Sequence, residues 1–150
     1  MQKITTFLTY NNQAEEAMNF YTSVFKNSKI VSVMQNGGVF FGGTFEIEGQ
    51  QFFALNGGPS FSFSLGISLF VNCPTQEEID NYWEKLSEGG RKDRCGWLQD
   101  KFGVAWQIVP PILGQLLGDK DGAKSQRVMQ AMLKMDKLDI QVLQDAADQK

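Results

Sequence analysis

Hydrophobic and polar positions change their period along residues 4–56, and the change predicts one helix among four strands. Residues 4–10, ITTFLTY, are rich in β-forming side chains and are followed by two asparagines. Apolar side chains then recur at the spacing of a helix with one buried face, at Ala17, Phe20, Tyr21, Val24 and Phe25. Three β-rich runs broken by glycines follow: KIVSVM, VFFGGTFEIEG and QQFFALN. We expect Asn12 and Glu15 to cap the helix.

The same order of patterns then recurs in the second part of the chain. Residues 65–72, LGISLFVN, predict a strand, and Thr75 with Glu78 forms a capping box for a second helix. The segment EEAMNFY matches EEIDNYW with a shift of 62 residues, which also superposes Thr6, Leu8 and Tyr10 on Ser68, Phe70 and Asn72. We interpret the match as two copies of a βαβββ unit, because the period is too long and the copies are too few for a solenoid.

The stretch CGWLQDKFGVAWQIVP, residues 95–110, predicts the final hairpin of the second unit. CGWLQ is a strand, DKFG is the turn, and VAWQIVP is the last strand, which ends at two prolines. Strand alternation sends Val104, Trp106 and Ile108 to one face, and Ala105, Gln107 and Val109 to the other. We therefore expect Trp106 to pack under a helix and Gln107 to face the space that the sheet encloses.

The residues after Pro111 predict a helical tail. ILGQLL is a short helix, residues 120–122 are a polar break, and Val128, Met129, Met132 and Met135 form an amphipathic stripe. A further helix begins near Asp139. These helices are expected to cover the sheet or a partner subunit. The chain is thus predicted to be one domain, residues 1–150, with module one at 1–60, module two at 61–111 and the tail at 112–150.

Composition favours a globular protein that binds neither nucleic acid nor membranes. The chain has 150 residues, of which 42% are hydrophobic, and this is ample for the core of one domain. The formal net charge is -3, with the cationic residues scattered among the acidic ones, so nucleic-acid binding lacks its main electrostatic support. No leader or membrane-spanning window is apparent, and we expect a cytoplasmic protein with two reduced cysteines.

The absence of histidine limits the available chemistry. Histidine-containing metal sites, Ser–His or Cys–His nucleophiles and histidine general bases are excluded. The reactive groups of the final hairpin are Cys95, for which we expect a partly buried, inert thiol, and Asp100, which we assign to the turn. Cys73 is expected to serve packing. We predict no catalytic residue, no metal ligand and no cofactor.

These patterns resemble those of a known group of proteins. The two βαβββ units, FYTSVF and DKFGVAWQIVP resemble the vicinal oxygen chelate superfamily, which contains glyoxalases, bleomycin-resistance proteins and extradiol dioxygenases. Within it, six fragments look like the PhnB-like group often labelled 3-demethylubiquinone-9 3-methyltransferase: AEEAMNFYTSVFKNSKI, FALNGGPSF, ISLFVNC, YWEKLSEGG, CGWLQDKFGVAWQIVP and RVMQAMLKMDKLDI. The resemblance implies an α+β, glyoxalase-like fold of cupped mixed sheets, here with C-terminal helices, and a homodimer. The stretch QNGGVFFGG is shorter than the loop expected there, which helps to roof the pocket.

The resemblance also implies where metal ligands would lie. Metal-using members of the superfamily bind a divalent ion through His or Gln on the first strand of each unit and through Glu on the last strand. The matching positions here are Thr6, Gly66 or Ser68, and Gln107, which supply neither an anionic nor an imidazole ligand. No pair of glycines follows a strand and opens a helix, so the nucleoside-binding turn of a Rossmann-type methyltransferase is not expected either.

We therefore expect a metal-free protein that binds a small, aromatic or amphipathic molecule inside its cupped sheets. The inward-facing candidates combine aromatic walls with neutral hydrogen-bonding groups; they are Thr6, Leu8, Asn56, Ser68, Phe70, Trp97 and Gln107. Leu8 and Phe70 are equally compatible with filling the cup. The alternative is an enzyme of the same superfamily, a methyltransferase, lyase or dioxygenase acting on a small metabolite. A third hypothesis is a structural or partner-binding role of the C-terminal helices.

Overall fold

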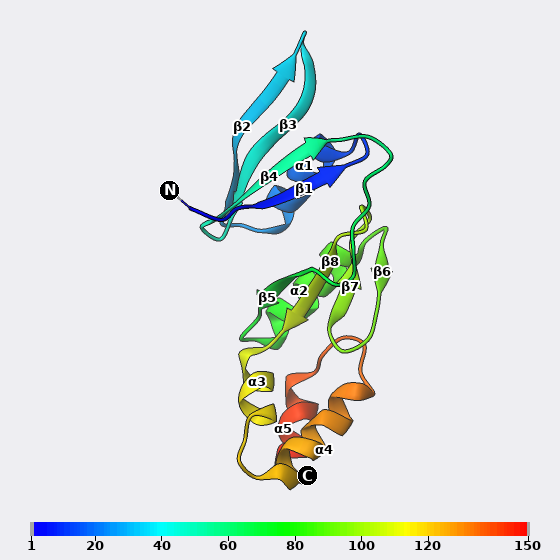
Figure 1. The fold of residues 1–150 in the computed structure, drawn as a ribbon. Helices are drawn as coiled ribbons and strands as arrows, with labels where there is room; N and C mark the ends of the chain where they lie inside the picture. The colour runs from blue at the N-terminus through cyan, green and yellow to red at the C-terminus, as the bar shows by residue number, and fades with distance from the viewer. Residues whose placement is uncertain (1, 150) are drawn as a thin grey trace. The chain divides into compact units, whose positions relative to one another are not determined.

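The computed structural model describes residues 2–149, which divide into two compact units. The first unit ends at Phe63 and the second begins at Ser64. Each unit has one four-stranded sheet (Figure 1), in which one pair of neighbouring strands is parallel and the other pairs are antiparallel. The predicted α+β fold, with two βαβββ modules followed by helices, is confirmed.

The first unit contains the predicted helix and four strands. Its elements are β1 (Thr6–Tyr10), α1 (Ala14–Val24), β2 (Ser28–Asn36), β3 (Val39–Ile47) and β4 (Gln50–Asn56). The strand order is β1-β4-β3-β2, in which β1 is parallel to β4 and the other pairs are antiparallel. Gly37 and Gly38 join β2 to β3 with φ angles of 59° and 79°, a conformation that glycine adopts without strain.

Helix α1 covers one face of this sheet. Leu8 and Tyr10 of β1 point toward it and are buried, and the hydroxyl groups of Tyr10 and Tyr21 lie 3.1 Å apart. Glycine is required at position 43, because a Cβ there would lie 2.7 Å from the Met18 side chain of α1 and 2.5 Å from a backbone oxygen of β2. The close approach of helix and sheet leaves no room for a larger residue.

The cap of α1 differs from the predicted one. Asn12 has a left-handed φ of 59°, and the N-cap residue is Gln13, whose side chain makes no capping bond. Instead, the backbone N–H of Ala14 donates to Oδ1 of Asn56, at the end of β4, over 2.9 Å. The prediction of Asn12 and Glu15 as caps is therefore wrong, because a residue 42 positions further along the chain supplies the acceptor.

The second unit repeats the arrangement with shorter strands. Its elements are β5 (Ser68–Asn72), α2 (Gln76–Ser87), β6 (Arg91–Lys92), β7 (Trp97–Gln99) and β8 (Ala105–Val109). The strand order β5-β8-β7-β6 again pairs the first and last strands in parallel. Thr75 caps α2 as predicted, because its hydroxyl oxygen accepts the backbone N–H of Glu78 over 3.2 Å.

The two faces of the second sheet follow the predicted alternation of β8. Helix α2 contacts β7 and β8, and the side chains of Leu98, Trp106 and Ile108 are buried. Gln107 lies on the opposite face and is only partly buried. The expectation that Trp106 packs under a helix is thus confirmed, and that Gln107 faces an enclosed space stays a prediction.

The two first strands are out of register by one residue relative to the sequence match. A shift of 62 residues pairs Leu8 with Phe70, but Leu8 lies on the helix-covered face of its sheet. Phe70 lies on the opposite face of its own sheet, because it is paired with Gln107. A shift of 63 residues equates Phe7 with Phe70 and restores equivalent faces. The predicted superposition is therefore wrong, because it pairs residues that lie on opposite faces of their sheets: Thr6, Leu8 and Tyr10 with Ser68, Phe70 and Asn72.

The C-terminal helices belong to the second unit. They are α3 (Pro111–Leu117), α4 (Gly122–Leu133) and α5 (Ile140–Asp148), and they share an apolar cluster with the end of β8: Val109, Leu113, Val128, Leu138, Leu143 and Ala147. Gln76 of α2 holds this tail, since its amide donates to the backbone oxygen of Leu138 and accepts from the N–H of Ile140. Within residues 2–149, no helix has the length and apolar character needed to cross a membrane.

A buried carboxylate organises the β7–β8 hairpin. Asp100 is 2% exposed, and its Oδ1 accepts the backbone N–H groups of Phe102 (2.9 Å) and Val104 (3.0 Å). Its Oδ2 accepts the indole N–H of Trp106 over 2.9 Å. The assignment of Asp100 to the turn is confirmed, and the carboxylate also anchors the core tryptophan of the next strand.

We expect Asp100→Asn to lower the free energy of unfolding by roughly 1–3 kcal/mol. Both oxygens of the Asp100 carboxylate accept N–H groups, and the asparagine would replace one of these oxygens by an NH₂ group, which cannot accept. Urea denaturation followed by circular dichroism measures the change. The matched control is Asp136→Asn, since Asp136 is exposed and its ion pair with Arg94 spans 3.4 Å. The control should change the free energy of unfolding by about 0–1 kcal/mol. Equal effects of the two substitutions would contradict the anchoring role.

Candidate functional site

The face of the second sheet opposite α2, called here the second open face, carries an aromatic and amide row. Phe70 of β5 is paired with Gln107 of β8, and Gln107 is paired with Trp97 of β7. Paired side chains on one face lie about 4.5–5.5 Å apart at Cβ. The amide of Gln107 is therefore flanked by two aromatic rings, and the Phe70 ring is 52% exposed.

The neighbouring row of the second open face holds the amide in place. Ser68 is paired with Ala105, one row from Gln107, and its hydroxyl oxygen accepts Nε2–H of Gln107 over 2.9 Å. The small Ala105 side chain lies between Ser68 and Gln99 of β7. The row provides hydroxyl, methyl and amide groups, which form hydrogen bonds or apolar contacts without carrying charge.

The charged groups at the outer edge of this face neutralise one another. Arg91 of β6 is paired with Gln99 and so shares its face. Its guanidinium binds the carboxylate of Asp93 through two hydrogen bonds, of 2.7 and 3.3 Å. The edge therefore adds little net charge to the second open face, and its neutral groups determine what it can bind.

The face of the first sheet opposite α1, called here the first open face, is more apolar at the equivalent positions. Phe7 is paired with Phe53, and Phe53 with Thr44. The two phenylalanine rings meet edge to face with their centroids 5.9 Å apart, and Phe7 is 54% exposed. Phe53 occupies the position that Gln107 holds in the second unit. Sequence reasoning missed Phe7, although alternation from the buried Leu8 would have placed it on this face.

The structure brings together four of the seven residues expected to face a ligand. Ser68, Phe70, Trp97 and Gln107 share the second open face. Thr6 and Leu8 lie instead on the α1 side of the first sheet, because they alternate with Phe7, and Leu8 is part of the core. The Oδ1 atom of Asn56 is used as the acceptor that caps α1. Ligand contacts of all seven stay predictions.

The positions implied for a metal do not suit one. Thr6 faces the α1 side of the first sheet, and Gly66 has no side chain to offer. Ser68 and Gln107 are hydrogen-bonded to each other and provide one hydroxyl and one amide. Among residues 2–149, no cluster of three or more His, Cys, Asp or Glu side chains could hold an ion. Neutral donors of this kind do not fit a tightly held divalent metal.

The chain also lacks a glycine-rich turn of the kind that binds nucleoside cofactors. The segments that lead from β1 to α1 and from β5 to α2 are residues 11–13 and 73–75, and they read NNQ and CPT. A Rossmann-type methyltransferase needs glycines at such a turn so that the backbone can approach the cofactor. These turns do not fit that requirement.

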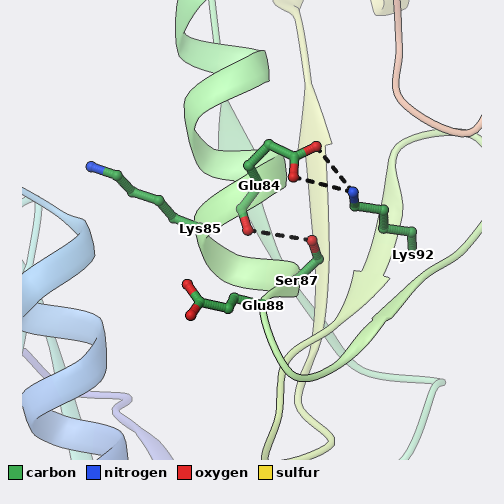
Figure 2. A pocket seen from close by; sticks show the side chains of 5 residues that line it. All are labelled: Glu84, Lys85, Ser87, Glu88 and Lys92. Carbon is green, nitrogen blue, oxygen red and sulfur yellow. Dashed lines mark hydrogen bonds and ion pairs between the residues drawn. The ribbon is translucent and has the colours of Figure 1, made fainter.

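Two surface hollows of the second unit lie away from its open face. The first, of about 380 Å³, is lined by residues around the end of α2 and by β6: Glu84, Lys85, Ser87, Glu88 and Lys92. Figure 2 shows its main ion pair, in which Lys92 binds both carboxylate oxygens of Glu84, over 3.0 and 3.2 Å. The second, of about 590 Å³, lies between α4 and α5, where Arg127 donates to the last carbonyls of α5. Neither is lined by an aromatic side chain, whereas the second open face carries two.

Comparison with known proteins identifies relatives that span most of the chain. A family model described as 3-demethylubiquinone-9 3-methyltransferase matches residues 2–109. A PhnB protein from Bacillus cereus is 40% identical, covers 73% of this chain and 99% of its own, and superposes with a TM-score of 0.68. Protein PA1353 from Pseudomonas aeruginosa is 18% identical over 73% of this chain and 98% of its own, with a TM-score of 0.58, and so shares the fold. No curated protein matches the chain.

The comparisons confirm the predicted PhnB-like resemblance for the two modules. The sixth fragment quoted for it, RVMQAMLKMDKLDI at residues 127–140, lies outside the residues matched by the family model. Helices α3, α4 and α5 all begin after residue 109, where the match ends. The helical tail is thus an addition to the matched part.

The two cysteines are free thiols, and Cys73 is buried. Burial raises the pKa of the Cys73 thiol from 9.0 to about 12, and the negative charge of Glu78 adds to the effect. The thiol is therefore protonated at neutral pH and serves packing, as predicted.

We expect Cys73 to resist iodoacetamide in the folded chain at pH 8 and to react once urea unfolds it. The pKa of the Cys73 thiol is higher in the folded chain than in the unfolded one. The protonated thiol therefore makes its full contribution to the free energy of unfolding below about pH 9, and this contribution is lost as the pH rises toward 12. The urea midpoint of the parent chain should therefore fall more steeply between pH 8 and 11 than that of Cys73→Ala. Parallel pH profiles would contradict this role of burial.

Proposed function

This chain belongs to the 3-demethylubiquinone-9 3-methyltransferase family, the PhnB-like group of the vicinal oxygen chelate superfamily, and on that premise we propose that it binds a small aromatic molecule on its second open face. The observation that carries the proposal is the row of Phe70, Gln107 and Trp97. Such a row combines apolar surface with a fixed polar group, which is the usual composition of small-molecule sites.

The aromatic side chains supply the affinity. Phe70 is half exposed and Trp97 is partly exposed, so a planar ligand that covers both removes on the order of 200 Å² of apolar surface from water. At about 25 cal/mol per Å², this contributes roughly 5 kcal/mol. Association costs part of this gain, so a ligand that makes no other contact would bind no more tightly than a dissociation constant of about 0.2 mM.

Binding is favoured over catalysis by the groups on this face. Ser68, Gln99 and Gln107 are neutral at every pH that the folded chain tolerates, and none of them is paired with a general base. The methyl transfer named by the family description would need a site for the methyl donor, and the strand-to-helix turns do not provide one. The proposed role is therefore to hold a ligand without a metal.

We expect ligand-observed NMR to detect binding of single-ring and fused-ring aromatic compounds at 25 °C, in about the submillimolar range. Phe70→Ala should weaken the best ligand roughly 5–30-fold, because it removes about 40–80 Å² of apolar contact. The control is Val142→Ala on α5, which removes exposed apolar atoms away from the row. It should leave the affinity within about twofold. Equal weakening by both variants, or none by Phe70→Ala, would overturn the proposal.

A further inference from the structure

Resting on the proposed function, we infer that the Gln107–Ser68 pair selects aromatic ligands that carry an amide-like edge, in which a hydrogen-bond donor lies next to an acceptor. Primary carboxamides and lactams attached to a ring have such an edge. Carboxylates lack the donor and carry a charge. The pair therefore defines the chemical class of the ligand, beyond its aromatic character.

The hydrogen-bonding inventory of Gln107 leaves one donor and one acceptor for a ligand. A glutamine amide has two N–H donors and one carbonyl acceptor. One N–H is used by Ser68, and this is the sole hydrogen bond that the Gln107 side chain makes within residues 2–149. The second N–H and Oε1 lie on one planar group, and they form a single edge when Ser68 takes the N–H that points away from Oε1. Their natural complement is a second amide, which returns one acceptor and one donor.

Ser68 makes the amide selective by fixing its orientation. The 2.9 Å bond from Nε2 to the Ser68 hydroxyl restricts rotation of the amide about its last side-chain torsion. A group that is already ordered loses less conformational entropy when a ligand binds. Without Ser68, the amide would turn freely, and its donor and acceptor would exchange places.

The flanking aromatic rings determine where the ligand edge lies. Phe70 and Trp97 stand on either side of Gln107 in one row, at the spacing of neighbouring strands. A ligand ring that stacks on one of them has its substituent directed along the row toward the Gln107 amide. An amide conjugated with the ring lies near the ring plane and so reaches both atoms of Gln107 together.

Charge excludes the most similar competitor. The Arg91 guanidinium, the cation at the edge of this face, is already bound to Asp93 through two hydrogen bonds. A bound carboxylate would lose its hydration without gaining a free cation, and its oxygen would face Oε1 of Gln107. The first open face has Phe53 at the position of Gln107, so it has no amide that could distinguish a carboxamide from a carboxylate.

The test compares three probes of nearly equal size: benzamide, methyl benzoate and benzoate. Each is titrated into the full chain up to about 10 mM by ligand-observed NMR. Benzamide should bind about tenfold more tightly than methyl benzoate, which lacks the donor, and benzoate should bind most weakly. Gln107→Leu should bring benzamide and methyl benzoate within about twofold of each other.

Ser68→Ala provides a second reading that does not alter Gln107. It should reduce the preference for benzamide about threefold, while circular dichroism confirms that the variant is folded. Equal binding of the three probes, or a benzamide preference that persists in Gln107→Leu, would overturn the inference and leave the proposed function standing. No binding of any probe at 10 mM would overturn both. If Gln107→Leu does not fold, an unchanged preference in Ser68→Ala overturns the inference.

Discussion

The buried carboxylate of Asp100 determines the geometry on which the candidate site depends. It ties the turn between β7 and β8 to the indole of Trp106 through three hydrogen bonds of 2.9–3.0 Å. Once Trp106 is fixed in the core, strand alternation requires Gln107 to point to the other face. Pairing of the hairpin then places Trp97 opposite Gln107. A buried charge in the turn thus positions two uncharged groups on the open face.

The two units share an architecture and differ in the chemistry of their open faces. In the first unit, Phe7 and Phe53 form an apolar pair, whereas Phe70 and Gln107 occupy the equivalent positions of the second. A phenylalanine offers contact area, and a glutamine with unused hydrogen-bonding groups offers discrimination as well. The helical tail belongs to the second unit, through the cluster around Val109. The unit with the proposed ligand site is therefore also the one that carries the helical tail.

Most of the fold could be predicted from the sequence, because its helices and longer strands carry strong periodic patterns. For β8, the sequence was enough to predict which side chains point to which face of the sheet, because the turn at Asp100 fixes the register of the strand. For β1, the faces could not be predicted. The sequence match between the two units survives a shift of one residue between strand and helix, but that shift puts Phe7 on the face that the match assigned to Leu8. The cap of α1 was missed because Asn56 comes from a distant strand, and β6 was not located because its two residues carry no period.

A native mass spectrum of the purified chain, recorded with and without a chelator, tests most directly whether the chain binds its ligand without a metal. The mass of the intact assembly also gives the number of subunits. We predict that the spectrum shows no metal adduct, whether the chain is bare or carries an organic mass that the chelator does not remove. The homodimer implied by the family resemblance would be seen in the same spectrum. A metal adduct that the chelator removes would contradict a site built from Phe70, Trp97, Ser68 and Gln107 alone.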